Sequence, residues 1–348
     1  MSPYIFSALC LGLGLGTTIT FASSHGLLAW MGIEMNTLAI LPLMAQCHHP
    51  RAIEATTKYF LAQATAAAVL LFATTTNAWI TGQWNIQQTS HPISITMIII
   101  ALALKMGLAP LHSWLPEVLQ GLNLTTGLIL STWQKLAPFA LMLQLPDTNT
   151  SILVLLGLSS TLVGGWGGLN QTQLRKILAY SSIAHLGWMM LVLPFYPNIT
   201  LLALFMYITT TSSTFLVLKL MKSTTINALT ISWTNTPALT SITPLILLSL
   251  AGLPPLAGFL PKLMILSELT KQGLGLTATL GAFSALLSLY FYLRLSYAMA
   301  LTISPNTTTS LAPWRLTPLT LSLPLASSTT LTILLLPLTP LLTTMLSL

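Results

Sequence analysis

Four ionisable side chains stand inside strongly apolar stretches of the sequence, and their chemistry suits proton transfer. They are Glu34, Lys105, Lys135 and Lys262. A charge at the centre of a membrane-spanning helix costs about 2.5–3.5 kcal/mol on insertion scales, so a partner or a function must offset that cost. Buried carboxylates and amines of this kind are typical of proton relays in membrane transporters.

The depth of each charged residue in its apolar segment distinguishes a functional role from a side chain that simply extends to the membrane surface. In an apolar segment over residues 123–145, Lys135 lies roughly 15 Å from either surface at ~1.5 Å per residue, too far for its stem to reach the headgroups. Lys105 is nearer the end of its segment, where a snorkelling side chain is the alternative. Glu34 must pair with a lysine of another helix or take up a proton, because an unpaired buried charge is costly.

Two histidines and a second glutamate extend this set. Histidine changes charge near neutral pH, and both His112 and His185 lie in apolar surroundings, although a helix-packing contact is the alternative for each. Glu268 follows Lys262 by six residues and is a candidate partner at the exit of the path. The predicted proton relay comprises Glu34, Lys105, His112, Lys135, His185, Lys262 and Glu268.

A repeated pattern of glycine, leucine and proline carries two of these lysines. The stretch from Lys105 to Glu117 has a second copy that ends at Lys262. Its residues Gly107, Leu108, Pro110, Leu111, Leu115 and Pro116 return 145 positions later as Gly252, Leu253, Pro255, Leu256, Leu260 and Pro261, Trp114 returns as Phe259, and Glu117 is replaced by Lys262. Proline removes a helix hydrogen bond, so both stretches predict a broken helix.

The helices that position these residues follow from composition. Hydrophobic residues make up 54% of the 348 residues and charged residues 5%, against roughly 25% charged in soluble domains. A spanning helix needs about 20 mostly apolar residues. Eleven segments fit that template: 3–22, 26–46, 57–80, 93–112, 123–145, 150–168, 176–194, 199–221, 242–270, 276–300 and 323–347.

The two copies of the repeat fall in the fourth and ninth segments. An odd number of spans separates them, which predicts opposite orientations in the membrane, and inverted repeats with broken helices are typical of ion transporters. We therefore predict an all-α polytopic membrane protein of about 11 transmembrane helices with two inverted five-helix repeats and proline-broken helices. The predicted divisions are 1–145 for the first repeat, 146–301 for the second, and 302–348 for a polar loop and a C-terminal transmembrane helix.

The net charge of +7 is spread thinly, so we expect a topology signal rather than a nucleic-acid surface. Loops on the side of the N-terminus hold Arg51, Lys58, Arg175, Lys176, Lys222 and Arg315, and the opposite loops hold Asp147 and Lys271. The positive-inside rule then places the N-terminus in a bacterial cytoplasm or a mitochondrial matrix. Arg294 is expected to be a snorkelling or lipid-facing anchor on the side of the N-terminus.

Other site types are not indicated by the sequence. Cys10 and Cys47 lack the spacing of a disulfide framework or a metal site. Gly12 and Gly16 do not fit a dinucleotide-binding loop, and their spacing predicts close helix packing instead. We therefore expect no metal, no bound cofactor and no reaction on a substrate within this chain.

Six short stretches together resemble one protein family. They are Trp30–Asn36, Lys58–Ala64, Lys105–Glu117, Thr132–Pro138, Leu178–His185 and Gly252–Lys262. Over essentially its full length the chain is similar to the antiporter-like membrane subunits of proton-pumping NADH:quinone oxidoreductase (respiratory complex I), which are related to Mrp-type sodium/proton antiporters.

The resemblance implies a mechanism and a setting. Glu34 and Lys105 would form an ion pair, Lys135 would bridge to the next site, and Lys262 would be the lysine of the second broken helix. Quinone reduction elsewhere in the complex would disturb the ion pair and drive protons along the relay. NADH, FMN, iron-sulfur clusters and ubiquinone would bind to partner subunits. The expected neighbours are other membrane subunits, including sister antiporter-like subunits, and lipid, in the mitochondrial inner membrane with the N-terminus in the matrix.

Two other functions fit the same helices. A Mrp-type cation/proton antiporter would move sodium against protons without an NADH-oxidising partner. A structural membrane subunit would hold its charges in static ion pairs and only scaffold an assembly.

Overall fold

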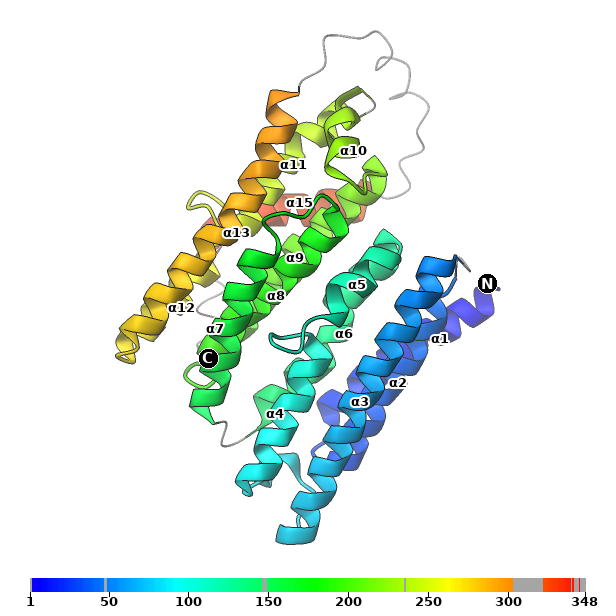
Figure 1. The fold of residues 1–348 in the computed structure, drawn as a ribbon, viewed down its shortest axis with the longest axis vertical. Coiled ribbons are helices and arrows are strands. Elements are labelled where there is room, and N and C mark those ends of the chain that lie inside the picture. Colours follow the sequence, from blue (N-terminus) through cyan, green and yellow to red (C-terminus); the bar gives the residue numbers. More distant parts are fainter. Residues whose placement is uncertain are drawn as a thin grey trace. The chain divides into compact units, whose positions relative to one another are not determined.

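The computed structural model describes residues 2–46, 49–145, 149–234, 236–302, 322–338, 340 and 344. Within these residues the secondary structure is helical, apart from two isolated backbone bridges (Figure 1). The chain forms two compact units, Met1–Leu156 and Gly157–Leu348, so the division falls inside a helix, α7 (Thr150–Gly167). Cys47, Asp147 and Arg315, which the sequence analysis used, lie outside the described residues, as does most of the predicted loop after residue 302.

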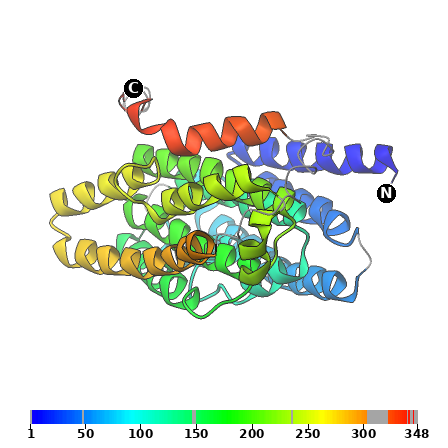
Figure 2. The ribbon, with the colours of Figure 1, turned by 90° about the horizontal axis from the view of Figure 1, so that it is seen from above.

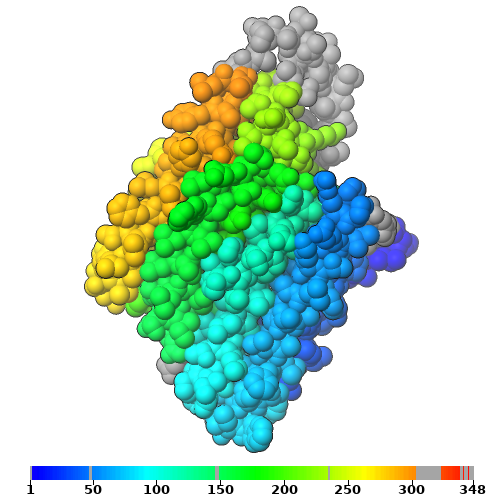
Figure 3. All heavy atoms as spheres, viewed as in Figure 1, coloured from blue at the N-terminus to red at the C-terminus, as the bar shows by residue number. Residues whose placement is uncertain are grey.

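The first unit is a bundle of long helices around one broken helix. In chain order they are α1 (Pro3–Ala22), α2 (Gly26–Met44), α3 (Pro50–Thr81), α4 (Pro92–Met106), α5 (Trp114–Gly121) and α6 (Leu124–Gln144). The central position belongs to α3, which packs against α2, α4 and α5. In the space-filling view, side chains close the space between α3 and α4 (Figure 3).

The second unit has the same kind of bundle with two helices added, the short α10 and the later α15. After α7 come α8 (Leu174–Val192), α9 (Pro197–Met221), α10 (Ile226–Ile231), α11 (Pro237–Ala251), α12 (Phe259–Lys271), α13 (Gly275–Leu301) and α15 (Ser322–Leu334). The helix α15 packs against α9 and α11 (Figure 2). Six described helices are long and apolar enough to cross a membrane: α1, α2, α3, α7, α9 and α13.

Proline and glycine set most helix boundaries. Proline opens α1, α3, α4, α9 and α11, where its missing N–H has no helical partner to lose. This is why α3 begins at Pro50, seven residues before the apolar segment predicted from 57. Predicted segment 242–270 divides into α11 and α12, as the proline pattern indicated, and predicted segment 93–112 ends in the break after α4, with α5 beginning only at Trp114.

Both breaks have the same backbone geometry. A glycine in the left-handed conformation follows each helix, Gly107 (φ 77°) after α4 and Gly252 (φ 82°) after α11. The next N–H closes the cap in both: Leu108 donates to Ala103 (3.0 Å) and Leu253 to Leu248 (3.3 Å). This Schellman arrangement satisfies a late carbonyl of each helix and favours glycine at the positive φ.

In each unit a backbone bridge joins two loops at equivalent places in the bundle. In the first, the bridge between His25 and Asn85 links the α1–α2 loop to the α3–α4 loop. In the second, the bridge between Gln173 and Thr225 links the α7–α8 loop to the α9–α10 loop. The helices α2 and α8, which follow these bridges, are each 19 residues long. The internal layout of the two units is therefore alike.

Close packing of α1 on α2 depends on glycine, as the sequence predicted. A Cβ atom on Gly32 would lie 2.9 Å from the carbonyl oxygen of Gly16, and one on Gly16 would lie 2.8 Å from the carbonyl oxygen of Gly32. Backbone atoms cannot move aside as a flexible side chain can, so small residues are required at this crossing.

Gly32→Ala is expected to destabilise the first unit by about 1–3 kcal/mol, because the new methyl group forces the helices apart. The measurement is the thermal midpoint of the chain in its native assembly. Gly14→Ala is the matched control, because a Cβ atom there has no neighbour within 4 Å. Equal midpoints for the two variants would contradict the packing role.

Candidate functional site

The first unit encloses a small polar cavity of about 10 Å³ between α2, α3, α4, α5 and α6. Its lining includes both buried lysines of this unit, Lys105 and Lys135, together with uncharged polar side chains. A cavity needs about 10–15 Å³ to admit one water molecule. The volume is therefore on the scale of a single water site.

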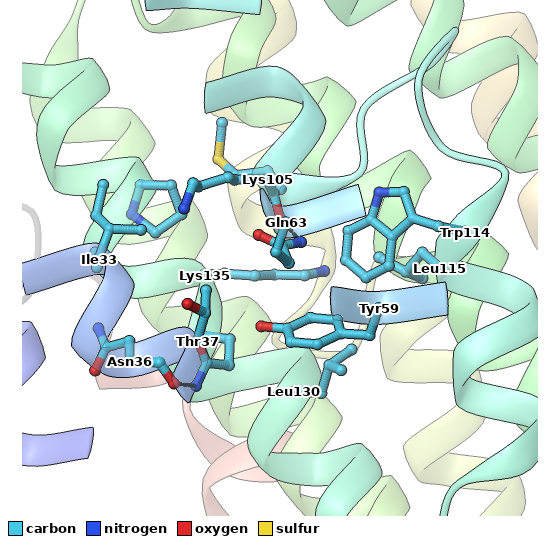
Figure 4. Close-up of a pocket in the computed structure, with 14 residues that line it drawn as sticks. Ile33, Asn36, Thr37, Tyr59, Gln63, Lys105, Trp114, Leu115, Leu130 and Lys135 are labelled. Carbon is cyan, nitrogen blue, oxygen red and sulfur yellow. Dashed lines mark hydrogen bonds between the residues drawn. The ribbon is translucent and has the colours of Figure 1, made fainter. Parts of the chain in front are cut away.

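The two lysines enter this cavity from different helices (Figure 4). Lys105 comes from the last turn of α4 and is 6% exposed, and Lys135 comes from the middle of α6 and is 5% exposed. The Nζ atom of Lys105 is buried without a hydrogen-bond partner. In Figure 4 the stem of Lys135 lies beside the ring of Tyr59. Two amines thus lie in one buried cavity, where either could accept or release a proton.

Two side-chain donors reach the last carbonyl groups of α4. Trp114, the first residue of α5, donates from Nε1 to the carbonyl of Leu104 (3.1 Å). Gln63 of α3 donates from Nε2 to the carbonyl of Lys105 (3.4 Å). These contacts fix the end of α4 and hence the position from which Lys105 projects.

The second unit has a corresponding cavity of about 20 Å³ between α8, α9, α11 and α12. Lys262, His185 and Tyr207 all line it. The rings of His185 and Tyr207 are 5.7 Å apart, centroid to centroid. An amine, an imidazole and a phenol thus share one enclosed space, and each can pass a proton.

The second break is capped by the lysine itself. Lys262 is 8% exposed, and its Nζ donates to the carbonyl of Ala251, the last residue of α11 (2.7 Å). A Cβ atom on Gly252 would lie 3.0–3.2 Å from the end of the Lys262 side chain. The lysine therefore occupies the space that glycine leaves at the helix terminus.

The sequence matches known protein families along most of its length. Residues 23–288 match the family described as NADH:quinone oxidoreductase/Mrp antiporter, TM, and residues 289–343 match NADH dehydrogenase subunit 2 C-terminus. The chain belongs to the NADH:quinone oxidoreductase/Mrp antiporter family.

Members of this family are close in sequence over full length. NADH-ubiquinone oxidoreductase chain 2 of Salmo salar is 68% identical over 349 residues, which cover 100% of both chains. The protein of the same name from Tetraodon nigroviridis is 69% identical over 340 residues, 98% of each chain.

Solved structures share the fold. A chain of respiratory complex I from Thermus thermophilus with bound aureothin superposes with a TM-score of 0.84 at 29% identity, covering 96% of this chain and 78% of that one. A chain of the Mrp complex from Dietzia sp. DQ12-45-1b gives a TM-score of 0.76 at 17% identity, covering 86% and 61%. The second likeness concerns the fold alone.

The ion pair that the resemblance implied between Glu34 and Lys105 is not formed. Both residues are described, and no salt bridge joins them. The half-buried Glu34 carboxylate instead accepts a hydrogen bond from Thr37, one turn further along α2 (3.0 Å). A local hydroxyl thus takes the place that the lysine was expected to fill.

Two other predicted relay residues lie away from the cavities. His112 is half-buried in the first break, where its Nδ1 is 3.3 Å from the carbonyl oxygen of Pro110, and it lines neither cavity. Glu268 pairs with Lys271 near the end of α12 (3.3 Å) rather than with Lys262. Six residues along a helix place Glu268 on a different face from Lys262.

The prediction that Arg294 faces lipid is wrong. Its guanidinium donates to the carbonyls of Leu169 and Gln171, the latter at 2.6 Å, and so ties α13 to the loop after α7. Guanidinium groups favour such multiple contacts because their donors form a rigid fork.

Several cavity residues escaped the sequence analysis because they carry no charge. In the first unit these are Asn36, Thr37, Tyr59, Gln63 and Gln134. Periodicity shows that a polar residue faces a helix neighbour, but not which cavity it lines. Among the described residues, no group of three or more His, Cys, Asp or Glu side chains is arranged to hold a metal ion.

Proposed function

We propose that this chain is a core membrane subunit of the proton-translocating NADH:ubiquinone oxidoreductase, complex I, of the mitochondrial inner membrane. The observation that carries the proposal is the match to NADH-ubiquinone oxidoreductase chain 2 of Salmo salar over the full length of both chains. The two lysine-lined cavities supply the chemistry, because proton transfer needs titratable groups held within hydrogen-bond reach of one another or of a bridging water.

The proposed proton relay runs through Glu34, Lys105, Lys135, His185 and Lys262. Within the first unit, Lys105 and Lys135 share a cavity, and within the second, His185 and Lys262 share one. His112 and Glu268 remain in the proposal only as groups near the ends of the path, since neither lines a cavity.

The membrane arrangement is part of the same proposal. About 11 transmembrane helices form two inverted five-helix repeats, with the N-terminus in the matrix. Support comes from the identical caps at the two broken helices and from the matching loop bridges in the two units. NADH, FMN, iron-sulfur clusters and ubiquinone would bind to partner subunits, and sister antiporter-like subunits and lipid would surround this chain.

The experiment is to solubilise the membranes gently, separate them on a native gel and locate this chain with an antibody. The same lane is stained for NADH oxidation. We expect the chain in a very large band that oxidises NADH. A small band without that activity, and sodium-dependent proton exchange by the isolated chain, would favour the Mrp-type antiporter, to which the family match extends.

A further inference from the structure

Glu34 is separated from Lys105 and Lys135, with which it is proposed to exchange protons. It does not line the first cavity, and no salt bridge joins it to Lys105. The hydroxyl of Thr37 donates to it and lies 2.8 Å from the Glu34 carbonyl oxygen and 3.0 Å from its Oε2. A proton that leaves this carboxylate for the cavity meets Thr37 first.

Thr37 and Tyr59 face the same cavity as the two lysines. Tyr59 is 2% exposed, and its ring packs edge-on against Trp114 with centroids 5.7 Å apart. Figure 4 shows its hydroxyl pointing away from Trp114, toward the side of the cavity where Thr37 lies. The Thr37 hydroxyl therefore joins the Glu34 carboxylate to the cavity of the two amines, and Tyr59 lines that same cavity.

The second unit repeats this pair with a stronger proton carrier. His185 is at the same position in α8 as Thr37 is in α2, counted along two helices of 19 residues that begin at Leu174 and Gly26. His185 contacts Tyr207, and both line the cavity of Lys262. A buried tyrosine next to this helix position, facing a buried lysine, is thus common to both units.

We propose that the hydroxyl groups of Thr37 and Tyr59 carry protons between Glu34 and the Lys105/Lys135 cavity. Each hydroxyl oxygen accepts one proton and releases its own to the next acceptor, so neither residue is changed after a transfer. Water in the cavity completes the chain where two groups are not in contact. The inference rests on the proposed function, because it assigns a route within that relay.

The test compares variants that remove a hydroxyl with variants that keep it, all in the assembled complex. Thr37→Val and Tyr59→Phe retain shape and lack the hydroxyl, whereas Thr37→Ser retains it. The controls remove buried hydroxyls that lie outside both cavities: Thr56→Val and Tyr292→Phe. Assembly is read from a native gel, and protons pumped per NADH oxidised are measured in proteoliposomes.

We expect Thr37→Val and Tyr59→Phe to assemble and to lower proton pumping by about tenfold. This is less than the roughly 10²–10⁴-fold of a general acid or base, because a water molecule can replace part of a hydroxyl's role. Thr37→Ser, Thr56→Val and Tyr292→Phe should pump as the unchanged complex does. Loss of pumping in Thr37→Ser as well would mean that packing, not the hydroxyl, matters, and would overturn the proposal. If Thr37→Val fails to assemble, Tyr59→Phe decides the question alone.

Lys135→Met, measured in the same series, distinguishes failure of the hydroxyl route from failure of the whole proposed relay. Normal pumping by Thr37→Val and Tyr59→Phe beside a defective Lys135→Met overturns the hydroxyl route and leaves the relay in place. Normal pumping by Lys135→Met overturns the proposed relay itself, and the hydroxyl route with it.

Discussion

Replacing Lys135 with methionine is expected to abolish most proton translocation while the complex still assembles. The amine is the bridging proton carrier in the proposed relay, and its loss should lower pumping by at least about tenfold. Methionine has a similar length and no charge, so it fits the buried position without the cost of an isolated ion.

The measurement is proton uptake by proteoliposomes during NADH oxidation, with the amount of complex read from a native gel. Lys58→Met is the control, since Lys58 is an exposed lysine that bridges Glu54 (2.8 Å) and Glu117 (2.7 Å). Exposed ion pairs contribute about 0–1 kcal/mol, so this control should assemble and pump normally. Lost assembly of Lys135→Met would instead support the scaffold function, in which the charge belongs to a static pair.

The second large effect is expected for Lys262→Met, which should impair both pumping and local stability. The variant removes the amine from the second cavity and also removes the donor to the Ala251 carbonyl. A buried carbonyl that loses its partner costs about 1–3 kcal/mol. We therefore expect a lower thermal midpoint together with lower pumping, whereas Lys135→Met should lower pumping alone.

Lys271→Met is the matched control for this variant. It removes a lysine from the same helix, α12, where Lys271 is 71% exposed and pairs with Glu268. The control should change neither the midpoint nor the pumping rate. A normal thermal midpoint for Lys262→Met would show that the hydrogen bond from Nζ to the end of α11 does not stabilise the fold. Normal pumping would show that Lys262 is not part of the relay.

The two broken helices use one backbone design with different lysines. Lys105 precedes the break in the first unit, and Lys262 follows the break in the second, at the position that Glu117 holds in the first. Glu117 is exposed and bonded to Lys58 rather than placed in a cavity. Both copies of the repeat therefore have the same turn, because its positive φ favours glycine. The lysine stands before the turn in the first copy and after it in the second.

Much of the fold could be predicted because its causes are local. Apolar length predicts spanning helices, proline sets their starts, and Gly107 and Gly252 mark breaks that need a positive φ. The buried charges were predictable for the same reason, since Lys135 lies too deep in its segment to reach water. The predicted helix boundaries were less accurate where a helix begins at a proline ahead of its apolar run, as α3 does at Pro50.

The sequence by itself determined an all-helical membrane protein with lysines at membrane depth and two proline-broken helices. Only the tertiary structure decided which groups share a cavity, because helix periodicity gives the face of a residue but not the neighbouring helix. It placed Tyr59 beside the lysines, bonded Glu34 to Thr37 instead of Lys105, and turned Arg294 inward. Such contacts join residues far apart in sequence, and packing of whole helices sets them.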